Sequence, residues 1–371
     1  MADFYSAIHS TQEDDVKFWD GTTEWGYVYS DGGLSADYRT PAGNADEAAR
    51  DALYGADYST LAAWEDARDR EGNTDSEHAI IMGPWSVKDT ADFHIDDGWD
   101  TDDMVIRAIG VSRVNGIWDT TDAYMLSVDM NDIGDKAIDI NYACVIDGIQ
   151  FEDVSGGANT NALLRIGYTG TGHVINCMFK LATDIASAGI DSDAAGTFNV
   201  WNCIIYADDT AGFSGTEGIH AVSGSTFNVY NTTIYCMDDG MEDSGSTLNV
   251  DSCAIFNCTD DIENADSINT CATDQGGGEG VGGVDISGGG GSDGDWETTE
   301  FVDPTTPFNF NVQDAAAAIK GTGTDNSGVF TNDIAGNTRT TWDIGAFEFE
   351  AIVGGNAGIM TTWGGFWGPT Y

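Results

Sequence analysis

Short apolar segments recur through the middle of the chain, each interrupted by a small polar residue. The clearest copies are Val145–Phe151, Val174–Phe179, Val200–Tyr206, Val229–Tyr235 and Val250–Phe256. Aligned on Asp147, Asn176, Asn202, Asn231 and Ser252, they repeat at steps of 29, 26, 29 and 21 residues. A second short apolar element, such as Gly218-Ile219, precedes several copies by 12 or 13 residues. A period of roughly 20 to 30 residues with several short strands per turn predicts a β-solenoid, in which stacked coils share one core.

The aligned positions predict ladders of like side chains along the solenoid. Asn176, Asn202 and Asn231 are expected to form an internal amide ladder, with one step of ~4.8 Å per coil. Next to it, a ladder of small side chains is predicted from Cys177, Cys203, Thr232 and Cys253. An aromatic column is predicted from Phe151, Tyr206, Tyr235 and Phe256. The cysteines are therefore interpreted as core packing, and whether Cys236 and Cys258 form a disulfide stays open.

The fold class expected from these patterns is all-β, a parallel β-helix with added segments at both ends. Residues 1–45 form an N-terminal arm that could dock, and residues 46–274 form the capped β-helix. Within the latter, helical spacing of apolar residues between Asp46 and Arg70 predicts one or two short capping helices. Residues 275–295 are a glycine-rich loop, 296–350 are the C-terminal end or cap of the β-helix, and 351–371 are a Gly/Trp-rich tail.

Three short motifs resemble a known family. Asp57–Glu65 (DYSTLAAWE), Gly83-Pro-Trp85 and Asp343–Glu348 (DIGAFE) are similar to segments of right-handed, pectin-lyase-like β-helix proteins. Many members of that family occur in tailed viruses and have no assigned activity. The resemblance extends over about Asp46 to Glu350. It implies a right-handed parallel β-helix, and it is more specific for the fold than for a function.

Aromatic side chains are concentrated at the two ends of the chain. The C-terminal tail carries Trp363, Phe366, Trp367 and Tyr371, and it resembles the Gly/Trp-rich terminal peptide of some phage structural proteins. The N-terminal arm carries Trp19 and Trp25 among other aromatic residues. An uncharged aromatic segment is expected to be covered, either by its own solenoid or by a neighbouring subunit. The second alternative predicts a homo-oligomer, a trimer or pentamer, that contacts other virion proteins.

Acidic residues dominate the charge of the chain. Asp and Glu number 63 against 13 Lys and Arg, which gives a formal net charge of −50. Such a surface repels itself in ordinary buffer, whereas 1 M salt shortens the Debye length to about 3 Å. The charge therefore indicates a halophilic origin, with an acidic, calcium-loaded secreted protein as the alternative. It argues against nucleic-acid binding. We expect neither a conventional signal peptide nor insertion into a membrane.

Three acidic pairs follow repeat strands at similar offsets: Asp208-Asp209, Asp238-Asp239 and Asp260-Asp261. Three interpretations stay open. The pairs could be a solvated surface, a cation site at Asp208, Asp238 and Asp260 for Ca²⁺, Mg²⁺, Na⁺ or K⁺, or catalytic acids of a glycoside hydrolase. The solvated surface is favoured because acidic residues are so abundant. The Arg, Lys and His residues are scattered, which argues against a lyase, and we expect no organic cofactor.

Together these patterns favour a structural protein over an enzyme. We expect a virion protein of a virus with a halophilic, haloarchaeal host, such as a capsid decoration, turret, tail fibre or spike subunit. It would assemble in the host cytoplasm, be exposed outside, and contact a surface glycan or glycoprotein of the host. The alternatives are a tailspike-like depolymerase of polysaccharide and a halophile cell-surface adhesin. Each of these functions rests partly on the fold alone.

Overall fold

A computed structural model describes most of residues 58–349 and five short strands before them. The described strands of the N-terminal region are residues 3–8, 17–19, 24–26, 29–30 and 33–34. Between 58 and 349 the description leaves out residues 59, 69–75, 82–84, 96–103, 131–135, 155–160, 183–186, 208–214, 276–279, 288–294, 306–307 and 314–316.

Three parallel sheets form the body of the protein, and strands that follow one another along the chain belong to different sheets. Sheet 1 has nine strands: β1 (Asp3–Ile8), β6 (Ser76–Ile81), β8 (Met104–Ala108), β11 (Cys144–Asp147), β14 (Thr171–Ile175), β17 (Thr197–Trp201), β20 (Thr226–Tyr230), β23 (Thr247–Asp251) and β26 (Ser267–Asn269). Sheet 2 has eight: β9 (Met125–Val128), β12 (Gln150–Asp153), β15 (Met178–Leu181), β18 (Ile204–Ala207), β21 (Thr233–Tyr235), β24 (Ala254–Phe256), β27 (Ala272–Thr273) and β28 (Val284–Asp285). Sheet 3 has seven: β7 (Phe93–Ile95), β10 (Lys136–Ile140), β13 (Asn161–Ile166), β16 (Ser187–Ser192), β19 (Glu217–Ala221), β22 (Asp239–Asp243) and β25 (Asp260–Glu263).

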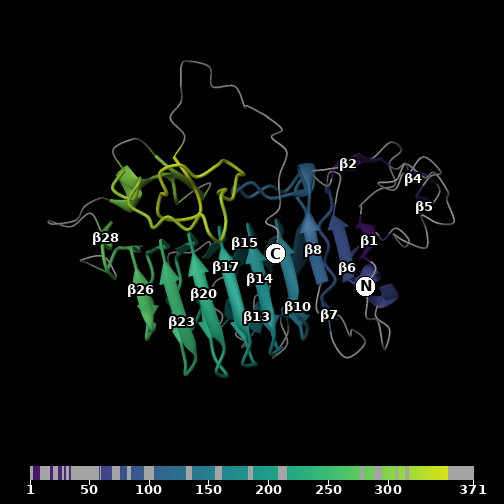
Figure 1. Cartoon of the computed structure of the whole chain (residues 1–371), viewed down its shortest axis with the longest axis horizontal. Coiled ribbons are helices and arrows are strands. Elements are labelled where there is room, and N and C mark those ends of the chain that lie inside the picture. The colour runs from purple at the N-terminus through teal and green to yellow at the C-terminus, as the bar shows by residue number, and fades with distance from the viewer. Residues whose placement is uncertain are drawn as a thin grey trace, which may run out of the picture.

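One strand from each sheet makes a coil, for example β10, β11 and β12, and the next coil begins with β13. This order is consistent with a β-solenoid, and we call the three-sheet body the solenoid. Its strands lie side by side along the long axis of the molecule, from β1 and β6 at one end to β26 and β28 at the other (Figure 1). The predicted repeat is thus a repeat of parallel strands.

Alternating burial explains why the repeats form strands. In β17, β20 and β23, every second side chain points into the core, including the aligned Val200, Val229 and Val250. These valines are at most 1 % exposed. β-Branched side chains on a half-buried pleated surface favour extended backbone. A single coil could not cover this face, so the neighbouring coils complete the core.

Asparagines mark the turn between sheets 1 and 2. Asn176, Asn202 and Asn231 have φ values of 52°, 54° and 42°, a left-handed conformation that asparagine tolerates better than most residues. The strand register corrects the alignment of the first repeat, because Asp147 pairs with Ile175. Gly148, with φ 79°, therefore occupies the turn position that the sequence alignment assigned to Asp147.

Inside this turn, small side chains form a column. Cys177, Cys203, Thr232 and Cys253 are each fully buried at equivalent positions. The thiols of Cys177 and Cys203 lie 3.8 and 3.5 Å from carbonyl oxygens of the preceding coil. All seven cysteines are free, including Cys236 and Cys258.

The predicted aromatic column divides between two faces of sheet 2. Phe151 points inward and stacks on Phe179, with ring centroids 4.7 Å apart and planes at 4°. Tyr206, Tyr235 and Phe256 share the next register position and form an aromatic cluster with C-terminal residues. The physical reason is the two-residue period of a strand, since a shift of one residue moves a side chain to the opposite face.

Additional elements pack at the N-terminal end of the solenoid. Helix α2 (Leu61–Arg68) lies inside the segment predicted to be helical, and Thr60 Oγ1 accepts a hydrogen bond from the N–H of Ala63 at 3.0 Å. Leu61 and Trp64 are fully buried in the core. Strand β1 falls within the predicted arm but pairs with β6 as the first strand of sheet 1. Two hairpins, β2 (Lys17–Trp19) with β3 (Glu24–Gly26) and β4 (Tyr29–Ser30) with β5 (Gly33–Leu34), follow β1.

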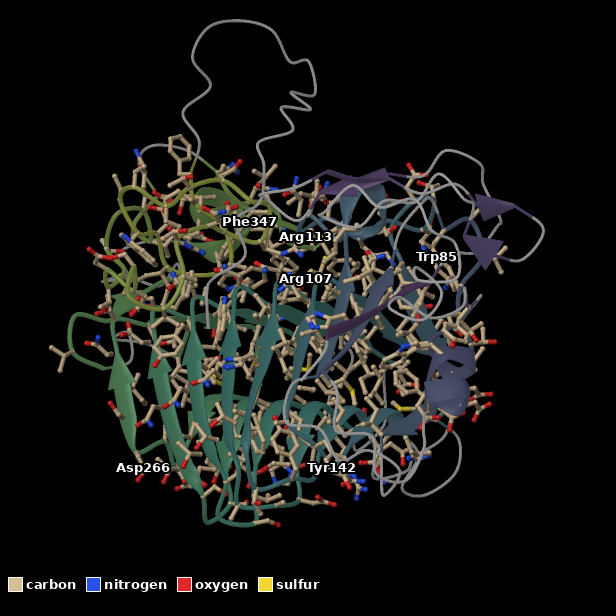
Figure 2. The ribbon with its side chains drawn as sticks, turned by 45° about the vertical axis from the view of Figure 1, so that its right-hand side comes forward. Trp85, Arg107, Arg113, Tyr142, Asp266 and Phe347 are labelled. Atoms are coloured by element: carbon tan, nitrogen blue, oxygen red, sulfur yellow. The ribbon has the colours of Figure 1, made fainter. Side chains whose placement is uncertain are left out.

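The C-terminal segment turns back along the side of the solenoid instead of continuing the coils. It contains a π-helical turn η2 (Trp296–Glu300), the antiparallel pair β29 (Phe301–Asp303) and β30 (Asn309–Val312), and irregular chain to residue 349. Its Phe347 lies beside Gly116, close to the 3₁₀ turn η1 (Gly110–Ser112) of an early coil. Figure 2 shows Phe347, Arg113 and Arg107 on one side of the ribbon, opposite Tyr142 and Asp266. The segment expected as an end cap therefore covers a long side.

Candidate functional site

An asparagine ladder runs along the outer face of sheet 1. Asn199, Asn228 and Asn249 occupy equivalent positions in β17, β20 and β23. Asn249 Nδ2 donates to Asn228 Oδ1, and Asn228 Nδ2 donates to Asn199 Oδ1, both at 3.0 Å. The ladder continues to Ser267 in β26. It is a row of amides repeated at the strand spacing of ~4.8 Å.

A second polar column lies beside this ladder on the same face. Tyr230, Asp251 and Asn269 follow one another in the register. Asn269 Nδ2 donates to Asp251 Oδ2 at 3.1 Å, and the hydroxyl of Ser252 donates to Asp251 Oδ1 at 2.8 Å. Burial raises the pKa of Tyr230, and the charge of Asp251 adds to this effect, so the phenol keeps its proton.

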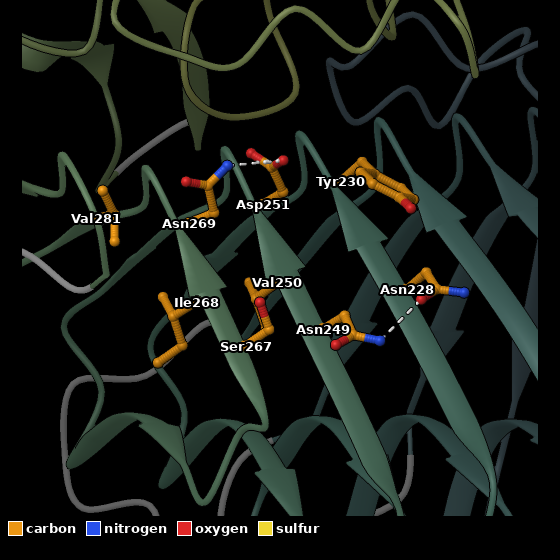
Figure 3. A pocket seen from close by; sticks show the side chains of 9 residues that line it. All are labelled: Asn228, Tyr230, Asn249, Val250, Asp251, Ser267, Ile268, Asn269 and Val281. Carbon is orange, nitrogen blue, oxygen red and sulfur yellow. Dashed lines mark hydrogen bonds between the residues drawn. The ribbon is translucent and has the colours of Figure 1, made fainter.

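The two columns lie along an open groove of about 430 Å³, which has both polar and apolar lining residues. It is lined by Asn228, Tyr230, Asn249, Val250, Asp251, Ser267, Ile268, Asn269 and Val281. Figure 3 shows their side chains on adjacent strands, with the Asp251–Asn269 contact above the asparagine ladder. Amides, hydroxyls and a carboxylate offer both donors and acceptors, and the Tyr230 ring offers an apolar surface. This chemistry suits a hydroxyl-rich ligand.

The outer face of sheet 3 carries a column of charged side chains. In register order it consists of His94, Asp139, Arg165, Asp191, His220, Glu242 and Glu263. Arg165 Nε donates to Asp139 Oδ1 at 2.8 Å, and Arg165 also pairs with Asp193. Basic and acidic residues alternate up to Glu242, after which Glu263 breaks the alternation.

His220 is surrounded by carboxylates. Its Nδ1 lies 3.2 Å from both Asp191 Oδ1 and Glu217 Oε2, and its Nε2 lies 3.8 Å from Glu242 Oε2. Burial alone would lower the pKa of His220, but the contact with Asp191 and the charges of Glu217 and Glu242 raise it. Burial raises the pKa of Glu217 to about 7, an effect that His220 opposes and Glu242 reinforces. The cluster therefore concentrates negative charge around one imidazole.

Among the described residues, the acidic pairs predicted from the sequence come together in part, because Asp239 lies next to Asp260 and the charge of Asp238 acts on Asp239. Asp208 and Asp209 lie outside the described residues. Asp238 accepts a hydrogen bond from the N–H of Gly215 at 2.7 Å, whereas Asp239 pairs in register with Asp260 on sheet 3. Burial raises the pKa of Asp239 to about 6, and neighbouring carboxylates contribute.

The last predicted pair is divided between solvent and core. Asp260 is exposed, whereas Asp261 is fully buried. Burial raises the pKa of Asp261 to about 9, and the neighbouring Asp274 carboxylate adds to the shift. Successive residues of a strand point to opposite faces, which separates the two carboxyls. The proposed trio of Asp208, Asp238 and Asp260 therefore has one member outside the description and two with different surroundings.

The predicted asparagine ladder contacts the C-terminal segment. Asn202 Nδ2 lies 3.3 Å from Asn176 Oδ1, and Asn176 Nδ2 donates to Asp147 Oδ1 at 3.0 Å. Asn231 Nδ2 instead donates to the carbonyl of Asp343 at 2.8 Å. The buried Arg339 donates to Asn202 Oδ1 at 2.9 Å. These asparagines thus join the coils to the segment that covers them.

The predicted assembly residues are only partly within the description. Trp19 lies in β2 and Trp25 in β3, where Trp25 pairs with Phe18. Trp363, Phe366, Trp367 and Tyr371 lie outside the described residues. The groove residues were missed by the sequence analysis, although a signal was present. Thr-Phe-Asn-Val at 197–200 and 226–229, and Thr-Leu-Asn-Val at 247–250, repeat an asparagine between two inward-facing positions.

The sheets and the groove define a β-solenoid-like protein with an exposed hydrogen-bonding face. No protein-family model, curated protein or solved structure matches the chain. Among the helices that the structure describes, none combines the length and the hydropathy needed to cross a membrane.

Proposed function

We propose that this protein is a right-handed, pectin-lyase-like β-helix that serves as a structural subunit on the virion of a virus infecting a halophilic host, and that it binds a glycan of the host surface. The observation that carries the glycan proposal is the groove of about 430 Å³ on sheet 1. Its Asn228–Asn249 step repeats at the strand spacing, so donors and acceptors recur at regular intervals. A regular row of hydrogen-bonding groups suits a polymer with a repeating, hydroxyl-rich unit.

The chemistry of the groove favours a neutral glycan over a strongly charged one. The carboxylate lining it, Asp251, already accepts hydrogen bonds from Asn269 and Ser252. An anionic polymer would also meet the net charge of −50. Neutral sugars can use the Asn228 and Asn249 amides and pack a ring face against Tyr230.

The test is titration of the full chain, in about 3 M salt, with neutral oligosaccharides isolated from the surface of halophilic cells. We expect Tyr230→Ala and Asn249→Ala each to weaken binding at least about tenfold, or ~1.4 kcal/mol. Asn115→Ala is the control, because Asn115 is an exposed asparagine outside both the ladder and the groove lining. Equal binding by all variants would refute the glycan proposal. Release of shortened sugars would favour the depolymerase alternative.

The structural role predicts self-assembly through the aromatic ends. The supporting features are the parallel strands of the solenoid, the covered long side, and the aromatic residues Trp363, Phe366 and Trp367 in the tail. Light scattering after size-exclusion chromatography in molar salt compares the full chain with a chain ending at Glu350. A trimer or pentamer that becomes a monomer on truncation is the expected result. Two folded monomers would contradict assembly through the tail and favour a cellular adhesin.

A further inference from the structure

Carboxylates gather around one histidine on the outer face of sheet 3, away from the groove residues of sheet 1. Glu217 and His220 come from β19, and Glu242 comes from the neighbouring β22. One potential ligand atom from each of the three lies within 4.8 Å of the other two. We propose that Glu217, His220 and Glu242 form a binding site for a single divalent transition-metal ion, with Zn²⁺ as the best fit. This proposal is independent of the glycan proposal.

The ligand types favour zinc over calcium. Calcium and magnesium are held by oxygen ligands, whereas Zn²⁺ binds a mixture of imidazole nitrogen and carboxylate oxygen at about 2.0–2.2 Å. His220 supplies one ring nitrogen, and one carboxylate oxygen from each glutamate lies within 4.8 Å of that nitrogen and of the other oxygen. Three protein ligands leave a further position for water.

The strands hold the three ligands in place before an ion arrives. His220 and Glu242 are directly paired in the parallel register of β19 and β22. Their side chains are half-buried, with about a quarter or less of each exposed. The Asp191 carboxylate, from β16 on the other side, lies 3.2 Å from His220 Nδ1 and places a further oxygen beside that nitrogen.

The distribution of charge supplies an independent reason for a cation at this position. In the earlier coils, Arg165 forms ion pairs with both Asp139 and Asp193. From the His220 coil onward, acidic residues follow one another on successive strands of sheet 3. In register, Glu217 is followed by Asp239 and Asp260, and Glu242 is followed by Glu263. Stacked like charges in adjacent coils repel each other. A divalent ion between Glu217 and Glu242 would restore the alternation that Arg165 provides earlier.

The Asp191 carboxylate adds to the negative charge at this position. Its Oδ1 is shielded from solvent and lies 3.2 Å from His220 Nδ1. A positive charge beside His220 therefore stabilises Asp191 as well as Glu217 and Glu242.

The experiment is a calorimetric titration of the chelator-treated full chain with Zn²⁺, in a concentrated salt whose anion binds zinc weakly. We expect one ion per chain, and at least about tenfold weaker binding by His220→Gln and by Glu242→Gln. His94→Gln is the matched control, since His94 lies in the same column between Asp92 and Asp139. Circular dichroism checks that every variant keeps its fold.

Several outcomes would overturn the proposal. One is the absence of Zn²⁺ binding, and another is weak binding of many ions that is equal in all variants. A third is Ca²⁺ binding that is as tight as Zn²⁺ binding and is unchanged in His220→Gln. If a variant fails to fold, Co²⁺ bound to the unmodified chain decides the question through its visible absorption. A band that Zn²⁺ abolishes at one equivalent supports a nitrogen-containing site, and a spectrum like that of Co²⁺ in the same salt refutes it.

Discussion

Asp261 places a carboxyl in the core where earlier coils carry glycine. The register aligns it with Gly189, Gly218 and Gly240. Asp261 is fully buried, one of its oxygens has no hydrogen-bond partner, and the other accepts from the N–H of Asp274 at 3.2 Å. Burial raises its pKa from 3.8 to about 9, and the Asp274 carboxylate contributes. The folded protein therefore holds Asp261 as a neutral acid at pH 7.

The substitution Asp261→Asn removes this ionisable group and keeps the shape of the side chain. Between pH 3.8 and about 9 the unfolded chain ionises Asp261, but the folded chain does not. The stability associated with the neutral acid is complete below pH 3.8 and is lost as the pH rises towards 9. The loss is ~1.4 kcal/mol per pH unit, or on the order of 4 kcal/mol between pH 5 and pH 8. The amide of the variant cannot ionise in either state, so the variant avoids this loss.

Urea unfolding, followed by tryptophan fluorescence at constant salt, measures the effect at pH 5, 6.5 and 8. Other groups also titrate in this range, so the informative quantity is the difference in unfolding free energy between variant and wild type. We expect that difference to increase with pH in favour of Asp261→Asn. Asp122→Asn is the control, because it removes one charge from an exposed position. A difference that does not change with pH would refute a neutral, buried Asp261.

Two further predictions concern buried charge and the acidic surface. Arg339 has no exposed side-chain area, and it lies among the buried carboxyls of Asp333, Asp343 and Glu348. Arg339→Met should therefore lower the unfolding free energy by about 3–5 kcal/mol, because the carboxyls lose their counter-charge. A change below about 1 kcal/mol in urea titration would contradict this. For the whole chain, the net charge of −50 predicts a lower melting temperature when salt falls from about 3 M to 0.1 M, as the Debye length grows to ~10 Å. An unchanged melting temperature would be evidence against halophilic adaptation.

Local repeats made the strands predictable, because each coil uses the same short-range pattern. Val200, Val229 and Val250 repeat in the sequence and pair in the structure. The cysteine column and the helix near Leu61 also depend on local spacing. The first repeat was misaligned by one residue because Gly148 and Asp147 are both plausible turn residues. An error of this size is enough to place Phe151 on the wrong face.

The candidate sites were harder to predict, for two different reasons. The groove depends on Asn228 and Asn249, whose repeated motif is visible in the sequence but gives no sign of an open face. The proposed metal site depends on bringing Glu217 next to Glu242. Because the coils differ in length, the sequence separation of two residues does not show whether they meet on neighbouring strands. Because Asp is so abundant, the sequence analysis also included Asp261 among the candidate site carboxylates, although its side chain is buried.

The sequence by itself determined the repeating parallel strands, the acidic surface and the aromatic ends. These follow from composition and from a pattern that recurs within each coil. Only the tertiary structure decided which faces are open. The contact of Arg339 with Asn202, 137 residues away, brings the C-terminal segment onto the long side of the solenoid. The sequence repeats do not predict such a contact, because the C-terminal segment does not itself repeat. The segment reaches one end of the groove, where Asn269 Nδ2 donates to Thr324 Oγ1 at 3.0 Å.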